Sequence, residues 1–164
     1  MKFFKRSVFF VVLIGIVLAA LYFIPLRRDI DISLPCVIWN IDDPVEGELE
    51  GIEIKGVYHD YLIKGDRFRG TVRISEVNAH EQNTEMTLEF DYWLDMQEAT
   101  LFYWSRVYNR TVFLGSIYMQ GTFDKMLIFL TGDGQNALLD DKCISAPATN
   151  IEEAIAIAKD LHFA

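Results

Sequence analysis

The sequence predicts a mainly β protein in which one N-terminal transmembrane helix precedes an antiparallel β-sandwich or strongly curved sheet with one C-terminal α-helix. Three observations lead to this fold class. An apolar run occupies residues 8–26, about seven short strand-like runs follow it, and residues 149–162 have helical periodicity. Because no helices separate the strand-like runs, an antiparallel sheet is favoured over a parallel one.

The apolar run at residues 8–26 predicts a retained signal-anchor. It contains no charged or amide side chain, and about 20 such residues cross the hydrocarbon core of a bilayer. A cleaved signal peptide is the alternative, but its apolar core would be shorter, roughly 7–15 residues. Cleavage near Ala19 and Ala20 would also leave an apolar N-terminus exposed. We therefore expect the lipid bilayer to surround residues 8–26.

Basic residues on the two sides of this run predict its orientation. Three of them and the α-amine precede it, whereas Arg27 and Arg28 follow it. The side richer in basic residues normally stays in the cytoplasm. We expect a single-pass membrane protein with a cytoplasmic stub and anchor at residues 1–28 and one extracytoplasmic domain at residues 29–164.

The domain at residues 29–164 is strongly acidic. Five of the 15 basic residues lie in the first 28 positions, which leaves ten basic residues against 24 acidic ones and a formal charge of −14. A surface of this charge repels the phosphates of nucleic acids, so we expect no nucleic-acid partner. The length of this part is that of one ordinary domain.

Two cysteines lie near opposite ends of the domain, at Cys36 and Cys143. Outside the cytoplasm a disulfide between them is permitted, and one bridge closing so long a loop would be stabilising. Two buried free thiols are the alternative, because cysteine is among the most frequently buried residues. Their spacing does not match a metal site.

Strand-like runs fill most of the domain, and turn residues separate them. Gly51 and Gly56 predict bulges or bends in the first run, and the runs on either side of Asn109 predict a hairpin. Residues 27–47 are expected to lead into the sheet, with a turn at 42–47 and no strand. The expected strands lie at residues 48–63, 67–75, 84–94, 99–108, 110–120, 121–132 and 142–145.

Alternation along residues 67–75 places Arg67, Arg69 and Arg73 on one face of the expected strand. These arginines form a candidate partner-binding basic stripe on an otherwise acidic domain. The alternative is that they make ion pairs with the acidic residues at 46–53 on the neighbouring strand.

The C-terminal residues predict a helix that packs on the sheet. Thr149 or Asn150 is a suitable N-cap, and Thr149 with Glu152 fits a capping box. An apolar stripe at helical spacing is expected to face the sheet. Its members are Ile151, Ala154, Ile155, Ala158 and Leu161.

The sequence contains no catalytic, cofactor-binding or metal-binding motif. His59, His80 and His162 lack the spacing of metal ligands, and strand alternation directs His59 and Asp60 to opposite faces. Carboxylate-based hydrolysis needs only two acidic residues, and Glu89 and Asp91 share a strand face with Glu85. Trp93, Tyr103 and Trp104 are the aromatic residues that could line a sugar-binding groove beside them.

These observations favour a membrane-anchored protein that acts by binding, with an envelope protein or a surface polymer as its partner. We expect neither a cofactor nor enzymatic activity. Two alternatives stay open. One is a small carboxylate-based hydrolase, and the other is a structural accessory subunit of a membrane complex that associates through the small residues Gly15 and Ala19.

Overall fold

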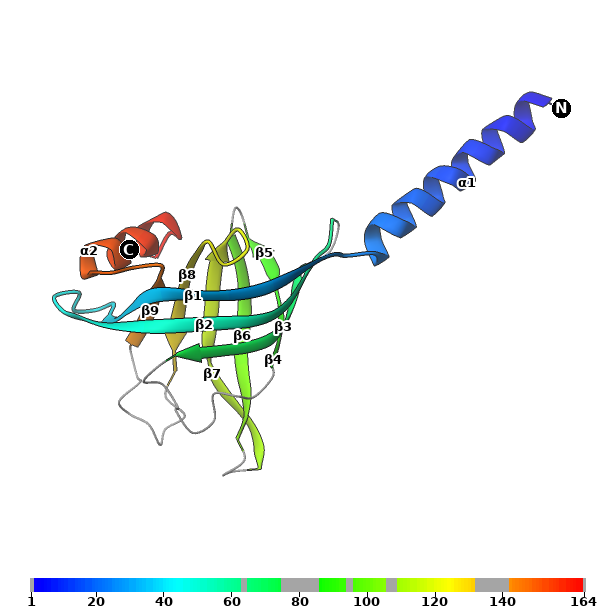
Figure 1. The fold of residues 1–164 in the computed structure, drawn as a ribbon. Helices are drawn as coiled ribbons and strands as arrows, with labels where there is room; N and C mark the ends of the chain where they lie inside the picture. The colour runs from blue at the N-terminus through cyan, green and yellow to red at the C-terminus, as the bar shows by residue number, and fades with distance from the viewer. Residues whose placement is uncertain are drawn as a thin grey trace.

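A computed structural model of the chain describes residues 2–62, 65–74, 86–93, 96–105, 109–131 and 142–163. Within these ranges, the side chains of residues 2–8, 20, 21, 93 and 103–105 lie outside the description. The protein is mainly β, as predicted, with a helix at each end of the described chain. Figure 1 shows α1 (Lys2–Phe23) projecting away from the sheet, whereas α2 (Ile151–Asp160) packs on it.

All strands within the described ranges belong to one nine-stranded antiparallel sheet. Its order across the sheet is β4-β3-β2-β1-β9-β8-β7-β6-β5, so strands that are consecutive in the chain are neighbours except for β4 and β5, and β1 also pairs with β9. The strands are β1 (Leu26–Asn40), β2 (Gly47–Asp60), β3 (Arg67–Ile74), β4 (Met86–Glu89), β5 (Asp91–Trp93), β6 (Met96–Ser105), β7 (Arg110–Gln120), β8 (Lys125–Leu130) and β9 (Lys142–Ala146).

The sheet closes on itself at Phe90. Strands β4 and β5 form its two opposite edges, yet Phe90 alone separates them in the chain. One extended residue spans only about 3.5 Å, so the two edges must meet. The sheet therefore curls into a tube, as its curvature in Figure 1 shows. Of the two predicted forms, the strongly curved sheet is observed. The single strand expected at 84–94 is divided into β4, which pairs with β3, and β5, which pairs with β6.

Strand β1 corrects the prediction that residues 27–47 form no strand. It is 15 residues long and pairs with β2 along nearly its whole length, from Leu26 opposite Asp60 to Trp39 opposite Gly47. The signal was present in the sequence, because apolar residues alternate from position 30 to position 38. Intervening charges and Pro35 obscured it. The sheet thus begins at Leu26, three residues before the expected start of the domain.

Inward-facing side chains fill the tube. Alternate residues of the strands, such as Ile52, Ile54 and Leu101, form one buried cluster. At one end, Phe123 enters the cluster from the β7–β8 turn with a left-handed φ of 65° and is 2% exposed. Its ring centroid lies 5.1 Å from that of Phe68, in an edge-on arrangement. A left-handed φ is unfavourable for a bulky residue, so packing against the aromatic cluster must offset that cost.

A second buried cluster lies outside the tube, between the sheet and α2. It joins Val37 and Trp39 of β1 to Leu127 of β8 and to Ala154 and Ala158 of α2. The same part of β1 also contributes Cys36 and Ile38 to the tube interior. This explains the four consecutive buried residues at 36–39. The predicted packing of the C-terminal helix on the sheet is thus observed, with Ile157 buried and Ile155 at the margin.

Both ends of α2 are capped. Asn150 is the N-cap and its side chain accepts a hydrogen bond from the Glu153 N–H, while Glu153 reaches back to the Thr149 N–H. The predicted pair of Thr149 and Glu152 is therefore replaced by Asn150 and Glu153, and Glu153 accepts from the residue before the N-cap. At the C-terminus the Phe163 N–H donates to the Ala158 carbonyl at 2.8 Å, which completes a Schellman motif. His162, expected at a fraying end, instead has the left-handed φ of 65° that this motif requires.

Gly56 and Gly70 face each other on β2 and β3 and do not introduce bulges. The register between these strands is continuous, so the predicted bulge at Gly56 is not observed. A Cβ on Gly70 would overlap the Lys55 carbonyl oxygen and lie 2.7 Å from the Cα of Gly56. The two glycines therefore make room for the Phe68 ring inside the tube.

Helix α1 contributes to neither buried cluster among the described residues. Its described apolar side chains are exposed, for example Phe9 at 63% and Ile16 at 61%. Within the part of the chain that the structure describes, no helix has both the length and the apolar character that crossing a membrane requires.

Replacing Gly70 by Ala should destabilise the domain by about 1–3 kcal/mol, because the added methyl group must displace backbone atoms of β2. Urea unfolding followed by tryptophan fluorescence measures the change. Gly15→Ala is the matched control, since a Cβ at that position meets no atom within 4 Å. Equal stability of the two variants would show that β2 and β3 are not held this closely together.

Candidate functional site

The most distinctive polar site lies at the seam where the tube closes. Asp66 immediately precedes β3, and Phe90 links β4 to β5. The Phe90 N–H donates to the Asp66 carbonyl oxygen at 2.8 Å, which ties the β2–β3 connection to the seam.

The Asp66 carboxylate is buried, with 3% of the residue exposed, and accepts hydrogen bonds on both oxygens. Its Oδ2 receives the Tyr58 hydroxyl at 2.7 Å, the Tyr92 hydroxyl at 2.6 Å and the Gln97 Nε2 at 3.1 Å. Its Oδ1 receives the Tyr61 N–H at 2.8 Å. The donors come from β2, β5, β6 and the β2–β3 connection, so one side chain joins elements from both sides of the seam.

The two tyrosines of this network stay protonated. Burial raises the pKa of Tyr58 well above its usual value, and the hydrogen bond to the negative Asp66 raises it further. The pKa of Tyr92 is also raised. Burial is the larger cause, and the hydrogen bond to Asp66 is the next largest. Two neutral hydroxyl donors thus surround one acceptor whose oxygens are both occupied. The arrangement is suited to holding strands together, because a buried polar group needs partners for its hydrogen bonds.

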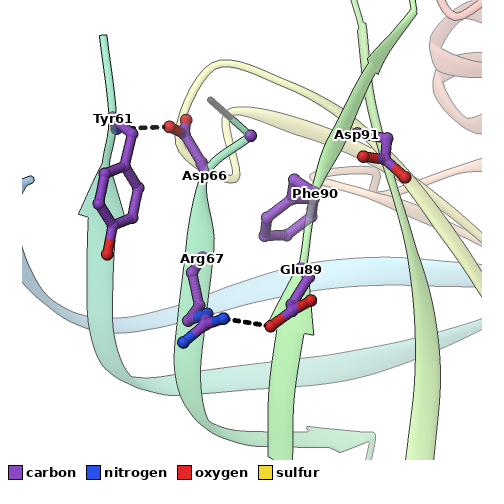
Figure 2. A pocket seen from close by; sticks show the side chains of 7 residues that line it. Tyr61, Asp66, Arg67, Glu89, Phe90 and Asp91 are labelled. Carbon is purple, nitrogen blue, oxygen red and sulfur yellow. Dashed lines mark hydrogen bonds and ion pairs between the residues drawn. The ribbon is translucent and has the colours of Figure 1, made fainter. Parts of the chain in front are cut away.

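A small pocket opens beside this network, with a volume of about 180 Å³. Figure 2 shows the Arg67 guanidinium and the Glu89 carboxylate facing each other in an ion pair between β3 and β4. Binding sites for small molecules usually measure roughly 300–1,000 Å³, so this pocket suits a few waters or a small ion better than a sugar. Its lining residues are Tyr61, Gly65, Asp66, Arg67, Glu89, Phe90 and Asp91.

Two of the predicted hydrolase carboxylates, Glu89 and Asp91, therefore line one pocket together with Asp66. Asp66 lies between the expected strands at 48–63 and 67–75, and nothing in its local sequence distinguishes a buried aspartate from an exposed turn residue. The prediction for Glu85 and His80 lies outside the described residues, as do the side chains of Trp93, Tyr103 and Trp104.

The basic stripe forms on the outward face of β3, where Arg67, Arg69 and Arg73 are exposed. Arg67 pairs with Glu89 of β4, and Arg73 lies 3.6 Å from Glu53 of β2. Arg73 thus has the type of partner that the ion-pair alternative predicted. Binding of another molecule by the stripe stays a prediction.

Cys36 and Cys143 lie on opposite faces of the sheet and are both free. Cys36 belongs to the tube interior and Cys143 to the cluster beneath α2. Burial raises the pKa of each thiol to about 12, with a smaller effect of Glu50 at Cys36. The predicted disulfide is therefore not formed in this structure, and the alternative of two buried free thiols is observed.

His59 and Asp60 have different surroundings. Asp60 accepts a hydrogen bond from the Arg28 guanidinium at 3.1 Å. His59 lies in register between Arg27 of β1 and Arg67 of β3, and its buried Nδ1 has no hydrogen-bond partner among the described residues. No group of three or more potential metal ligands gathers in the described part of the chain.

Comparisons with protein-family models, with curated proteins and with solved structures find no match for this chain.

Replacing Tyr58 by Phe should lower the free energy of unfolding by about 1–2 kcal/mol at pH 7, because it removes a buried hydroxyl from Asp66. It should also reduce the loss of stability at high pH. Above pH 10 the unfolded chain releases a tyrosine proton that folded Tyr58 retains, so unfolding becomes more favourable as the pH rises.

Urea unfolding at pH 7 and at pH 10.5 measures both effects. Tyr22→Phe, on α1 and outside the seam, is the matched control. If the free energy of unfolding fell as much between pH 7 and pH 10.5 in Tyr58→Phe as in Tyr22→Phe, this account of the seam would be contradicted.

The two thiols should react slowly with a disulfide reagent in the folded protein. A rise in pKa from 9.0 to about 12 lowers the thiolate fraction at pH 8 by roughly three orders of magnitude. Reaction with Ellman's reagent should become fast only after denaturation and should then count two thiols. Reducing and non-reducing gels should show equal mobility, and a mobility shift would indicate a bridge instead.

Proposed function

We propose that this chain is a single-pass membrane-anchored protein whose β-rich domain lies outside the cytoplasm and acts by binding. Residues 8–26 would lie in the lipid bilayer, with the N-terminus in the cytoplasm. The observation that carries the proposal is the exposure of the described apolar side chains of α1, none of which joins a buried cluster.

Exposure of this kind is unfavourable in water. From Phe9 to Leu18 the large apolar residues of α1 have exposed fractions between 43% and 69%. Burying one such side chain stabilises a protein by about 1.5–3 kcal/mol, so a run of them calls for lipid or protein around it. Basic residues lie before and after the apolar run, and none lies within it. This distribution is typical of a membrane segment.

A binding role for the domain follows from how its interior is used. Packed side chains fill the tube, and both oxygens of Asp66 already accept hydrogen bonds from the protein. Recognition would then use the outer surface of the sheet. Its partner would be an envelope protein or a surface polymer, because the formal charge of −14 disfavours nucleic acids.

A carboxylate-based hydrolase is the second candidate function. Its support is the convergence of Asp66, Glu89 and Asp91 on one pocket. It ranks second because both Asp66 oxygens already accept hydrogen bonds from the protein, Glu89 is paired with Arg67, and about 180 Å³ is too small for a saccharide substrate.

The full-length chain should sediment with membranes, resist extraction at alkaline pH and dissolve in non-ionic detergent. A variant that lacks residues 1–25 keeps every strand and should be found in the soluble fraction as a folded domain, since β1 begins at Leu26. Cell fractionation followed by immunoblotting measures the distribution.

Protease added to sealed cells tests the orientation, because only an outward-facing domain is digested before lysis. Recovery of the full-length chain in the soluble fraction would contradict the anchor. Protection of the domain in sealed cells would contradict its placement outside the cytoplasm.

A further inference from the structure

Among the described residues, the wall of the tube has an open stretch along the first half of β1. On one side β1 pairs with β2 from Leu26 to Trp39. On the other side it pairs with β9 only from Val37 to Asn40, and the Ala148 N–H donates one further bond to the Pro35 carbonyl. Beyond that bond the chain leaves the sheet for α2. No described residue pairs with this second side of β1 between residues 26 and 34.

The backbone groups along this open edge can be assigned. Successive residues of an antiparallel strand direct their N–H and C=O groups to alternate sides. Because the Pro35 carbonyl points toward β9, the odd-numbered residues face the same side. Arg27, Asp29, Asp31 and Ser33 therefore present their N–H and C=O groups along the open edge, while the even-numbered residues bond to β2.

The inward side chains next to this edge are incompletely covered. Ile30, Ile32 and Leu34 pack against the tube interior but remain only partly buried, unlike Cys36 and Ile38 further along the strand, where β9 covers that side. Figure 1 shows this half of β1 running past the end of the tube that contains the β7–β8 turn, toward α1. An open backbone edge and an apolar inner row thus lie along the same residues.

These features define the chemistry of an occupant. Only an extended peptide presents N–H and C=O groups at the spacing of this edge, about 6.8 Å for every second residue. Its alternate side chains would have to be apolar to cover Ile30 and Ile32. The others would lie beside Arg27, Asp29 and Asp31, whose charges prevent indiscriminate strand pairing and so favour basic residues opposite the two aspartates.

We propose that the open edge of β1, from Arg27 to Ser33, binds an extended strand of another protein by β-augmentation. This names the partner class for the binding role proposed above, although pairing at the edge does not itself require the anchor. With α1 in a bilayer, the edge would begin four residues after the end of that helix. The partner strand would then be a segment close to the membrane surface.

The test uses full-length protein in non-ionic detergent and a fluorescent, acetylated peptide amide of sequence Val-Thr-Val-Lys-Val-Lys-Val-Glu. Paired antiparallel, it places its lysines opposite Asp29 and Asp31 and its glutamate opposite Arg27. Fluorescence polarisation should show saturable binding. Ser33→Pro removes one edge N–H without affecting the bonds to β2, and should weaken binding at least about tenfold.

Ser33→Ala is the matched control, because it changes the same exposed side chain and keeps the N–H. It should bind the peptide like the unaltered protein. Hydrogen exchange should slow on peptide addition at the amides of Asp29, Asp31 and Ser33. A peptide N-methylated at its pairing amides should not bind.

Absence of saturable binding, or equal binding by the two Ser33 variants, would overturn the proposal. A concentration-dependent dimer that Ser33→Pro dissolves and the peptide cannot enter would also overturn it, by assigning the edge to a second copy of this chain. None of these outcomes changes the result of the cell fractionation. The proposal of strand binding at the edge can therefore fail separately from the proposal of a membrane anchor.

Discussion

Closure of the sheet at Phe90 is the constraint on which the rest of the structure depends. One residue connects the two outermost strands, so β3 and β6 are brought to opposite sides of the same short segment. The buried Asp66 carboxylate fastens this segment by accepting hydrogen bonds from β2, β5 and β6. Such a group is costly to bury unless every partner is in place, and this requirement selects one register at the seam.

The closed sheet divides the apolar residues into two separate cores. Inside the tube, paired glycines at Gly56 and Gly70 admit the Phe68 ring, and Phe123 fills one end. Outside it, α2 covers the part of the wall formed by β1, β8 and β9. The two thiols follow this division, since Cys36 lies in the first core and Cys143 in the second. Both cysteines are thus buried core residues and not the two halves of a disulfide.

The same wall is incomplete where β9 ends, and this is where we propose that the molecule binds. In the described sheet, seven of the nine strands have a neighbour on both sides, and paired strands do not recruit further chains. The first half of β1 lacks a neighbour on one side and adjoins the apolar helix α1. Anchorage and recognition would therefore lie at the same end of the domain.

The sequence by itself determined the mainly β character, the hairpin at Asn109, the C-terminal helix and the outward arginines of β3. These features follow from local periodicity and from turn and cap residues, which act over a few positions. The tertiary structure alone decided that residues 84–94 divide between two partners and that Asp66 is buried. Each of these depends on residues far apart in the chain, such as Tyr92 and Gln97 around Asp66, so no local pattern carries the information.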